Sequence, residues 1–369
     1  KNPFIINFLN YEKKINKELS FKLKDLKNKK NRIKINEFSI QEENNKIKIK
    51  DLVLNDKFQI LDLNIINLDY LDKEKQKNSL SILKKNKRYL AKGTYFNANN
   101  LIDKLLIDDV KQSNIFINNQ SIMIDIKKIR LDKDYELDNL SGNLNFKNQN
   151  LMNGKLVGNF SSDKRLEFTV INDGNSKITT LFMDYAKPIV RRYKFIKGFD
   201  DGVLDFYSTK IGEKSNSTLK IYDFKLKELP LLTKILTLAS LQGIADILSG
   251  EGIRFDEFEM NFRNEKTTMT IDEIYAIGPA ISILMDGYVE KNKTVSLRGT
   301  LVPATTINKF IGSLPVLGKL LVGSKTGEGV FGVSFKIKGP PKSLETTVNP
   351  IKTLTPRFIT RTLEKIKKN

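Results

Sequence analysis

The chain of 369 residues contains no cysteine and no histidine. Without these side chains it cannot form a disulfide, a zinc site of the cysteine and histidine type, a thiol nucleophile or a triad with an imidazole base. Catalysis would have to rely on carboxylates, lysine or serine, and no spacing nominates a pair of carboxylates. We therefore predict that the chain is not an enzyme and holds no catalytic site, no metal and no cofactor.

The sequence also lacks a signal peptide and an uninterrupted membrane-spanning run. Its longest apolar run is LPLLTKILTLASLQGIADIL, residues 229–248, which three polar residues on one third of the helical wheel interrupt. This pattern favours a buried helix that closes the end of a sheet. The second interpretation is a helix that contacts a membrane surface, through Leu231, Leu232, Ile235, Leu236, Ile244 and Ile247.

Positive charge is in excess, with 63 Lys and Arg against 43 Asp and Glu and a formal net charge of +20. Such a balance is compatible with nucleic acid or with an anionic membrane as a partner. However, the basic runs KNKK (27–30) and KKNKR (84–88) lie at expected turns, and no nucleic-acid-binding motif is present. We predict no specific nucleic-acid binding and only weak, general binding to anionic lipid.

Most of the chain alternates apolar with polar residues, the period of strands that have one dry and one wet face. Turn sequences such as NDG, DDG and KNK separate these segments at short intervals. The pattern predicts a mainly β protein with roughly twenty strands and a few short helices. Clear examples are NRIKINEFSI, NKIKIKDLVL, KRLEFTVI, STLKIYDFKL, FDEFEMNF, KTTMTIDEI, AISILMDGYV and TVSLRGTLV.

The stretch GKLLVGSKTGEGVFG, residues 318–332, contains two frames that resemble nucleotide-binding motifs. The first has Ser before Lys, the reverse of a phosphate loop, and the second opens a strand where a dinucleotide fingerprint should open a helix. A repeat explains the glycines better, because LPLLTKIL (229–236) and LPVLGKLL (314–321) both lead to GEG and then to a strand. The glycines are predicted to turn the chain with positive φ between helix and sheet.

Several segments in the last third of the chain resemble the C-terminal region of the AsmA-like family of Gram-negative envelope proteins, most closely its YhdP-type members. From about residue 90 the preceding part is compatible with this resemblance. The matching segments are DFKLKELPLLTKILTLASLQGIADILSGEGIRF (223–255), GPAISILMDGYV (278–289), GTLVPATTIN (299–308), LPVLGKLLVGSKTGEGVFGVSFKIKGP (314–340) and VNPIKTLTPRFI (348–359).

The resemblance implies a long twisted antiparallel sheet, curled into an open hydrophobic groove that carries phospholipid between the inner and outer membranes. It implies a role in outer-membrane biogenesis and a periplasmic location, with an inner-membrane anchor in a segment absent from this chain. We expect residues 1–195 to form a β-rich groove segment and residues 196–369 the YhdP-type region. Partners would be phospholipids, a membrane surface and unidentified envelope proteins.

Transport in such a groove would be passive, because each methylene gains about 0.8 kcal/mol in an apolar site while successive positions along the groove are equivalent. An envelope assembly factor for outer-membrane proteins and a plain β-sandwich interaction module remain alternatives, since both share the same alternation. The residues predicted to line the groove are Leu219, Ile221, Phe258, Met260, Phe262, Ile281, Ile283, Met285, Val295, Leu297, Leu301, Phe331, Val333, Phe335 and Ile337.

Overall fold

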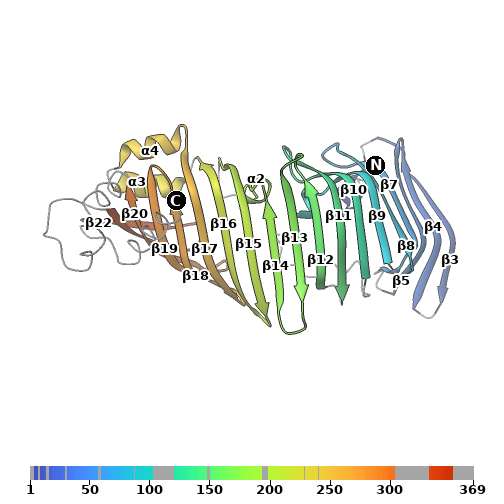
Figure 1. The fold of residues 1–369 in the computed structure, drawn as a ribbon. Helices are drawn as coiled ribbons and strands as arrows, with labels where there is room; N and C mark the ends of the chain where they lie inside the picture. Colours follow the sequence, from blue (N-terminus) through green and yellow to red (C-terminus); the bar gives the residue numbers. More distant parts are fainter. Residues whose placement is uncertain are drawn as a thin grey trace. The chain divides into compact units, whose positions relative to one another are not determined.

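The computed structural model confirms a mainly β protein (Figure 1). It describes residues 4–6, 9–13, 16–29, 31–56, 60–86, 88–102, 120–147, 150–192, 198–227, 229–239, 241–303 and 332–351. The chain divides into two compact units, Lys1–Asp184 and Tyr185–Asn369. The sequence placed its boundary between residues 195 and 196.

The first unit is built almost entirely from strands that follow one another in the sheet (Figure 1). A short hairpin of β1 and β2 precedes them. The strands are β1 (Ile5–Ile6), β2 (Tyr11–Glu12), β3 (Ser20–Lys29), β4 (Arg32–Glu42), β5 (Asn45–Asn55), β6 (Ile60–Asp62), β7 (Ile65–Leu71), β8 (Lys77–Lys85), β9 (Arg88–Asn97), β10 (Gln120–Arg130), β11 (Glu136–Lys147), β12 (Asn150–Asn159), β13 (Arg165–Asn172) and β14 (Lys177–Met183).

One pairing in this unit departs from the antiparallel pattern that the sequence predicts. Strands β9 and β10 run parallel, with Tyr89 opposite Ile122 and Gly93 opposite Ile126. A parallel pair needs a crossover of a dozen or more residues, whereas an antiparallel pair can be joined by a tight turn. The chain between Asn97 and Gln120 is long enough for that crossover.

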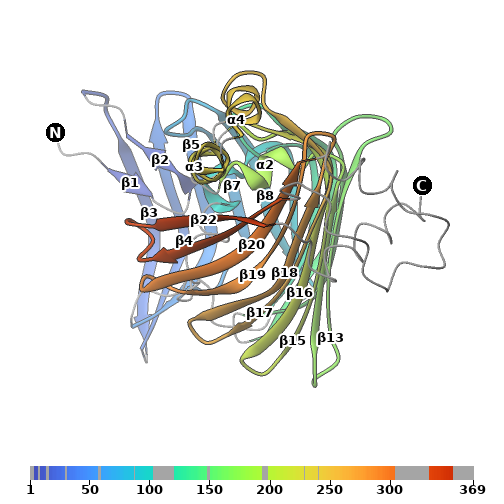
Figure 2. The same cartoon turned by 90° about the vertical axis from the view of Figure 1, so that its left-hand side faces the viewer.

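The second unit is a meander of antiparallel strands with short helices at one end of them (Figures 1 and 2). The sheet is curved and open, as predicted. Its elements are α2 (Lys187–Val190), β15 (Asp200–Ile211), β16 (Lys214–Leu226), α3 (Pro230–Leu238), α4 (Gln242–Ser249), β17 (Ile253–Glu265), β18 (Thr268–Ile277), β19 (Ile281–Glu290), β20 (Thr294–Pro303), β21 (Gly332–Gly339) and β22 (Glu345–Ile351).

The apolar run at residues 229–248 forms two helices, α3 and α4, where the sequence predicted one. The first begins with Pro230 in its first turn and ends at Leu238, with Ala239 as its C-cap residue. The N–H of Leu241 then bonds to the carbonyl of Leu236 at 2.8 Å, outside the regular helical spacing. Helix α4 begins at Gln242, next to Gly243, whose backbone freedom weakens a continuous helix.

The GEG turn that follows α4 confirms the predicted positive φ at the second glycine of the first repeat copy, whereas Gly250 has φ −93°. Gly252 has φ +89°, and a Cβ atom there would lie 2.7 Å from the carbonyl oxygen of Leu226. Any other residue would meet both backbone strain and a steric clash. The second copy, at 327–329, lies outside the described residues.

Acidic residues and asparagine with positive φ occur inside several long strands. The backbone φ is +52° at Asp25 and Asp51, +53° at Asn139, +60° at Asp201 and +50° at Asp223. At Asp223 the pairing of β16 with β17 passes from Tyr222–Glu257 directly to Phe224–Phe255. Such irregularities bend a strand and increase its twist, and aspartate and asparagine tolerate the left-handed region better than branched residues do.

We expect Asp223→Val to destabilise the protein by about 1–2 kcal/mol, because a β-branched residue is strained at positive φ. Asp223→Gly should be close to neutral, since glycine adopts this conformation freely. Urea unfolding followed by circular dichroism measures both. Asp205→Val, on the neighbouring strand β15 and with no positive φ, is the matched control; an equal loss in the control would show that the positive φ is not the cause.

Candidate functional site

The predicted groove residues lie on one face of the second unit's sheet. The register places Leu219 opposite Met260, then Ile274, Met285, Gly299 and Phe335 along one row across six strands. Residues that pair directly across strands point to the same side of a sheet. We call this side the apolar face of the second unit.

Two further rows run beside this one on the same apolar face. The row nearer to the helices is Ile221, Phe258, Ala276, Ile283, Leu301 and Val333, and the row on the other side is Ser217, Phe262, Ile271, Gly287, Leu297 and Ile337. Ile281 and Val295 belong to the apolar face through their own strands β19 and β20. The structure therefore brings together every predicted residue except Phe331, which lies outside the described residues.

Sequence reasoning missed Ala276 and two isoleucines of β18 on this face, Ile271 and Ile274. The two isoleucines are three residues apart, which breaks strict alternation. The register between β18 and β19 shifts between these two positions, so both reach the same side. A bulge explains the pattern. The signal available in the sequence was the pair Asp272 and Glu273, two polar residues between two isoleucines.

Burial varies along the apolar face. Leu301 is fully buried and Ile281 is 0% exposed, whereas Met260, Met285 and Leu297 are only partly buried. Leu301 and Ile281 lie toward the end of the strands where α3 and α4 are inserted between β16 and β17, but Ile271 and Ile337, in the row farthest from these helices, are also buried at 5% and 4% exposed. The apolar face therefore combines buried positions in all three rows with partly buried ones such as Met260, Met285 and Leu297.

The helices and a stack of aromatic rings close the end of the strands where Leu301 and Ile281 lie. Leu232, Ile235 and Leu236 of α3 are buried, and α3 contacts β22. The Phe224 ring stacks between those of Phe199 and Phe255, at centroid distances of 5.5 and 5.4 Å. These offset stacks add to the stabilisation from apolar burial.

This burial favours the first interpretation of the helical run, a helix that closes the end of a sheet. Of the residues proposed for membrane contact, Leu232, Ile235 and Leu236 are buried. Leu231 is exposed and Ile244 is partly buried, while the side chain of Ile247 lies outside the described part. Among the described residues no helix combines the length and apolar character needed to cross a bilayer.

The opposite face of the second unit carries charged pairs that bridge neighbouring strands. Lys220 stands directly across from Glu259, with Nζ and Oε2 3.4 Å apart. Asp286 stands across from Arg298, with Oδ1 and Nε 2.8 Å apart. Paired charges of this kind are typical of a solvated sheet surface. The opposite face is therefore polar at these positions, whereas Tyr275, Leu284 and Val302 on the same face are buried.

The first unit has an apolar face of its own, for which the sequence predicted a groove segment but no individual residues. Ile40 pairs with Ile47, Ile47 with Leu68, and Leu68 with Leu80. Ile40 and Ile47 are each 2% exposed, because the hairpin residue Tyr11 belongs to the same buried cluster. Strand alternation alone cannot show that Tyr11 covers Ile40 and Ile47, since β2, which contains Tyr11, is only two residues long.

Tyr11 anchors the N-terminal hairpin to this cluster. Its hydroxyl donates a hydrogen bond of 2.6 Å to Oε2 of the buried Glu42, and its ring meets that of Tyr70 edge to face at 5.8 Å. Burial, the hydrogen bond to Glu42 and the charge of Glu42 raise the pKa of Tyr11. Tyr70 in turn donates to the carbonyl of Leu9 at 2.7 Å.

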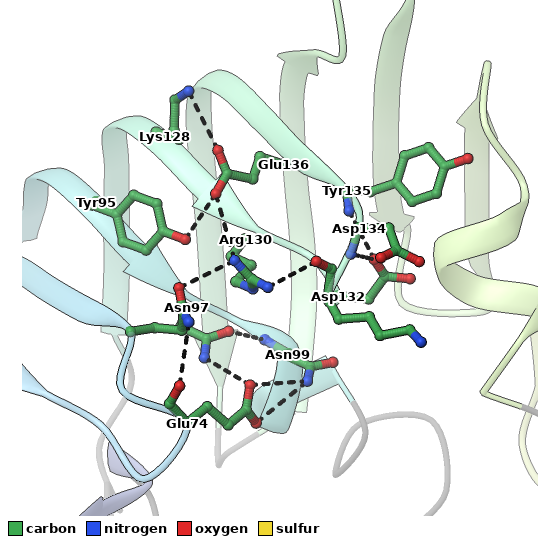
Figure 3. Close-up of polar contacts among 12 residues, drawn as sticks. Glu74, Tyr95, Asn97, Asn99, Lys128, Arg130, Asp132, Asp134, Tyr135 and Glu136 are labelled. Atoms are coloured by element: carbon green, nitrogen blue, oxygen red, sulfur yellow. Dashed lines mark hydrogen bonds and ion pairs between the residues drawn. The ribbon is translucent and has the colours of Figure 1, made fainter.

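A gathering of carboxylates and amides lies at the ends of β9 and β10 (Figure 3). Glu136 accepts a hydrogen bond of 2.9 Å from the Tyr95 hydroxyl and lies 3.8 Å from Arg130. Glu74 accepts from Asn97 and from Asn99. Each carboxylate is engaged by neighbours from adjacent turns and strands, so these contacts join the end of the parallel pair to the rest of the sheet.

A hollow of about 600 Å³ lies on the first unit among mostly polar side chains. Its walls include Lys46 and Lys48 of β5 on one side and Lys92 of β9 on the other. Ser79 and Ser81 of β8 form part of its floor. Long lysine stems beside short serines account for the depression.

Comparison of the chain with protein-family models, with curated proteins and with solved structures gives no match. The class of protein is therefore defined by its own geometry: a mainly β protein with one long, open sheet.

Proposed function

We propose that this protein binds the acyl chains of phospholipids on the apolar face of the second unit and lets them move along it. The observation that carries the proposal is the set of three apolar rows across β16 to β21, in which Met260, Met285 and Leu297 are only partly buried. Isolated exposed apolar residues need no explanation, but a contiguous apolar surface marks a binding site.

The arrangement of the second unit favours an occupant from outside the sheet. Its described strands β15 to β22 are consecutive neighbours, so within this part of the chain no second sheet lies over the apolar face. This disfavours the β-sandwich alternative for that unit. Acyl chains would supply the missing apolar contacts, at about 0.8 kcal/mol for each buried methylene.

The rows also explain why bound lipid could move. Successive positions along the face offer isoleucine, leucine, methionine and phenylalanine, which differ little in affinity for a methylene chain. Methionine adapts its shape readily to a neighbour. With the resemblance to AsmA-like proteins, this supports passive carriage between the two membranes of a Gram-negative envelope, with the head groups in water.

Photo-crosslinking tests the proposal directly. We expect benzoyl-phenylalanine at Met285 to crosslink phospholipid that copurifies with the protein, detected by organic extraction and mass spectrometry. Tyr288, on the same strand but on the opposite face and 42% exposed, is the matched control and should give no lipid adduct. Protein that contains no lipid and takes up none, or equal crosslinking at both positions, would remove the proposal.

A protein client would point to the alternative of an envelope assembly factor. In that case the crosslinker at Met285 should capture polypeptide in place of lipid. The same samples, analysed by gel electrophoresis, distinguish the two functions.

A further inference from the structure

Strand β3 forms an edge of the first unit's sheet. Its register pairs Phe21 with Ile40, Leu23 with Phe38 and Leu26 with Ile35 of β4. Within the described part of that unit, β3 has no second partner strand. The outer side of such a strand presents backbone N–H and C=O groups that can pair with another chain.

The apolar side chains of β3 remain exposed, although their row continues into the buried cluster. Phe21, Leu23 and Leu26 are 54%, 49% and 54% exposed, whereas Ile40 and Ile35, their partners on β4, are 2% and 7% exposed. The Phe4 ring lies edge to face against Phe21 at 5.2 Å and still leaves Phe21 half open. The apolar row thus ends at β3, the edge strand, where its side chains are not covered by other described residues.

The other side of β3 carries lysines that the sheet neutralises poorly. Lys24 lies 4.0 Å from Glu37, but Glu37 is also paired with Lys48 at 3.0 Å. Lys27 stands directly opposite another lysine, Lys34. Like charges opposite each other across strands are destabilising. Carboxylates placed next to these lysines would relieve that repulsion.

We propose that the β3 edge accepts an extended strand of a partner polypeptide in which apolar residues alternate with acidic ones. The backbone pairing would extend the sheet, the apolar residues would cover Phe21, Leu23 and Leu26, and the acidic residues would face Lys22, Lys24 and Lys27. This partner differs from the lipid of the proposed function and does not depend on it.

The lysines also argue against a second copy of this chain as the occupant. Two β3 strands side by side would place lysine rows next to each other, a charge pattern that natural edge strands use to prevent self-association. An acidic partner meets the opposite sign at the same positions. Charge therefore selects the partner, while backbone pairing and apolar contact supply affinity.

Peptide binding to the full chain tests the proposal. We expect a fluorescein-labelled peptide of about nine residues, long enough for a strand, that alternates valine with glutamate to bind, as measured by fluorescence anisotropy. A peptide that alternates valine with lysine should bind at least tenfold more weakly. Amide hydrogen exchange should show new protection in Ser20–Lys29. Equal binding of both peptides, or protection of another strand only, would overturn the proposal.

Two variants sharpen the test. Leu23→Lys should weaken binding of the glutamate peptide at least tenfold, while Ile171→Lys, an equally exposed apolar position on β13, should not. If Leu23→Lys fails to fold, the double variant Lys22→Glu and Lys24→Glu decides, because it should reverse the preference in favour of the lysine peptide. An unchanged preference for the glutamate peptide in this double variant would overturn the acidic-strand assignment. Dimers that form with rising protein concentration, exclude the peptide and become stronger in the double variant would overturn it as well.

Discussion

Leu301→Lys is expected to unfold the second unit, whereas Met285→Lys should leave it folded and unable to hold lipid. Both residues lie on the apolar face, but Leu301 is 0% exposed and Met285 is only partly buried. An unpaired charge at a sealed position costs about 3–5 kcal/mol, a large part of the ~5–15 kcal/mol that holds a domain together. At Met285 the lysine stem can follow the apolar surface and bring its ammonium to water.

Urea unfolding followed by circular dichroism, together with uptake of a fluorescent phospholipid, measures both effects. Phe335→Lys should behave like Leu301→Lys, because Phe335 is 4% exposed. Ser296→Lys, on the polar face of β20, is the control and should change neither stability nor uptake. If Met285→Lys unfolds, the face is a sealed core; if it folds and loads lipid normally, the groove assignment is wrong.

Tyr11→Ala should destabilise the first unit by about 3–5 kcal/mol, the usual cost of removing a large buried aromatic ring. The ring is 1% exposed, packs against Tyr70 and supplies a hydroxyl donor to the buried Glu42. Tyr11→Phe keeps the ring and removes only the donor. It should cost about 1–3 kcal/mol, because a buried acceptor loses a hydrogen bond.

Equilibrium urea unfolding by circular dichroism is the appropriate measurement, since the chain has no tryptophan. Tyr288→Phe, at a position that is 42% exposed, should be neutral and serves as the control. Equal stability of wild type and Tyr11→Ala would mean that the N-terminal hairpin does not contribute to the core of the first unit.

The positive-φ residues show where prediction from sequence reached its limit. The alternation around STLKIYDFKL correctly predicts a strand and places Leu219 and Ile221 on one face. It cannot show that Phe224, three residues after Ile221, lies on the same face. Strict alternation would place Phe224 on the opposite face, but the backbone at Asp223 has positive φ and interrupts the alternation. Aspartate alone does not indicate a residue with positive φ, since it also occurs at ordinary polar positions such as Asp205.

The sequence by itself determined the mainly β class and the side of the sheet on which each described groove residue lies, because strand alternation is a local property with a period of two. Only the tertiary structure decided the parallel pairing of β9 with β10 and the cover that β2 gives to Ile40 and Ile47. It also distinguished the sealed Leu301 from the accessible Met285. Burial and pairing depend on which distant segment arrives at a strand, and that information is absent from the strand's own residues.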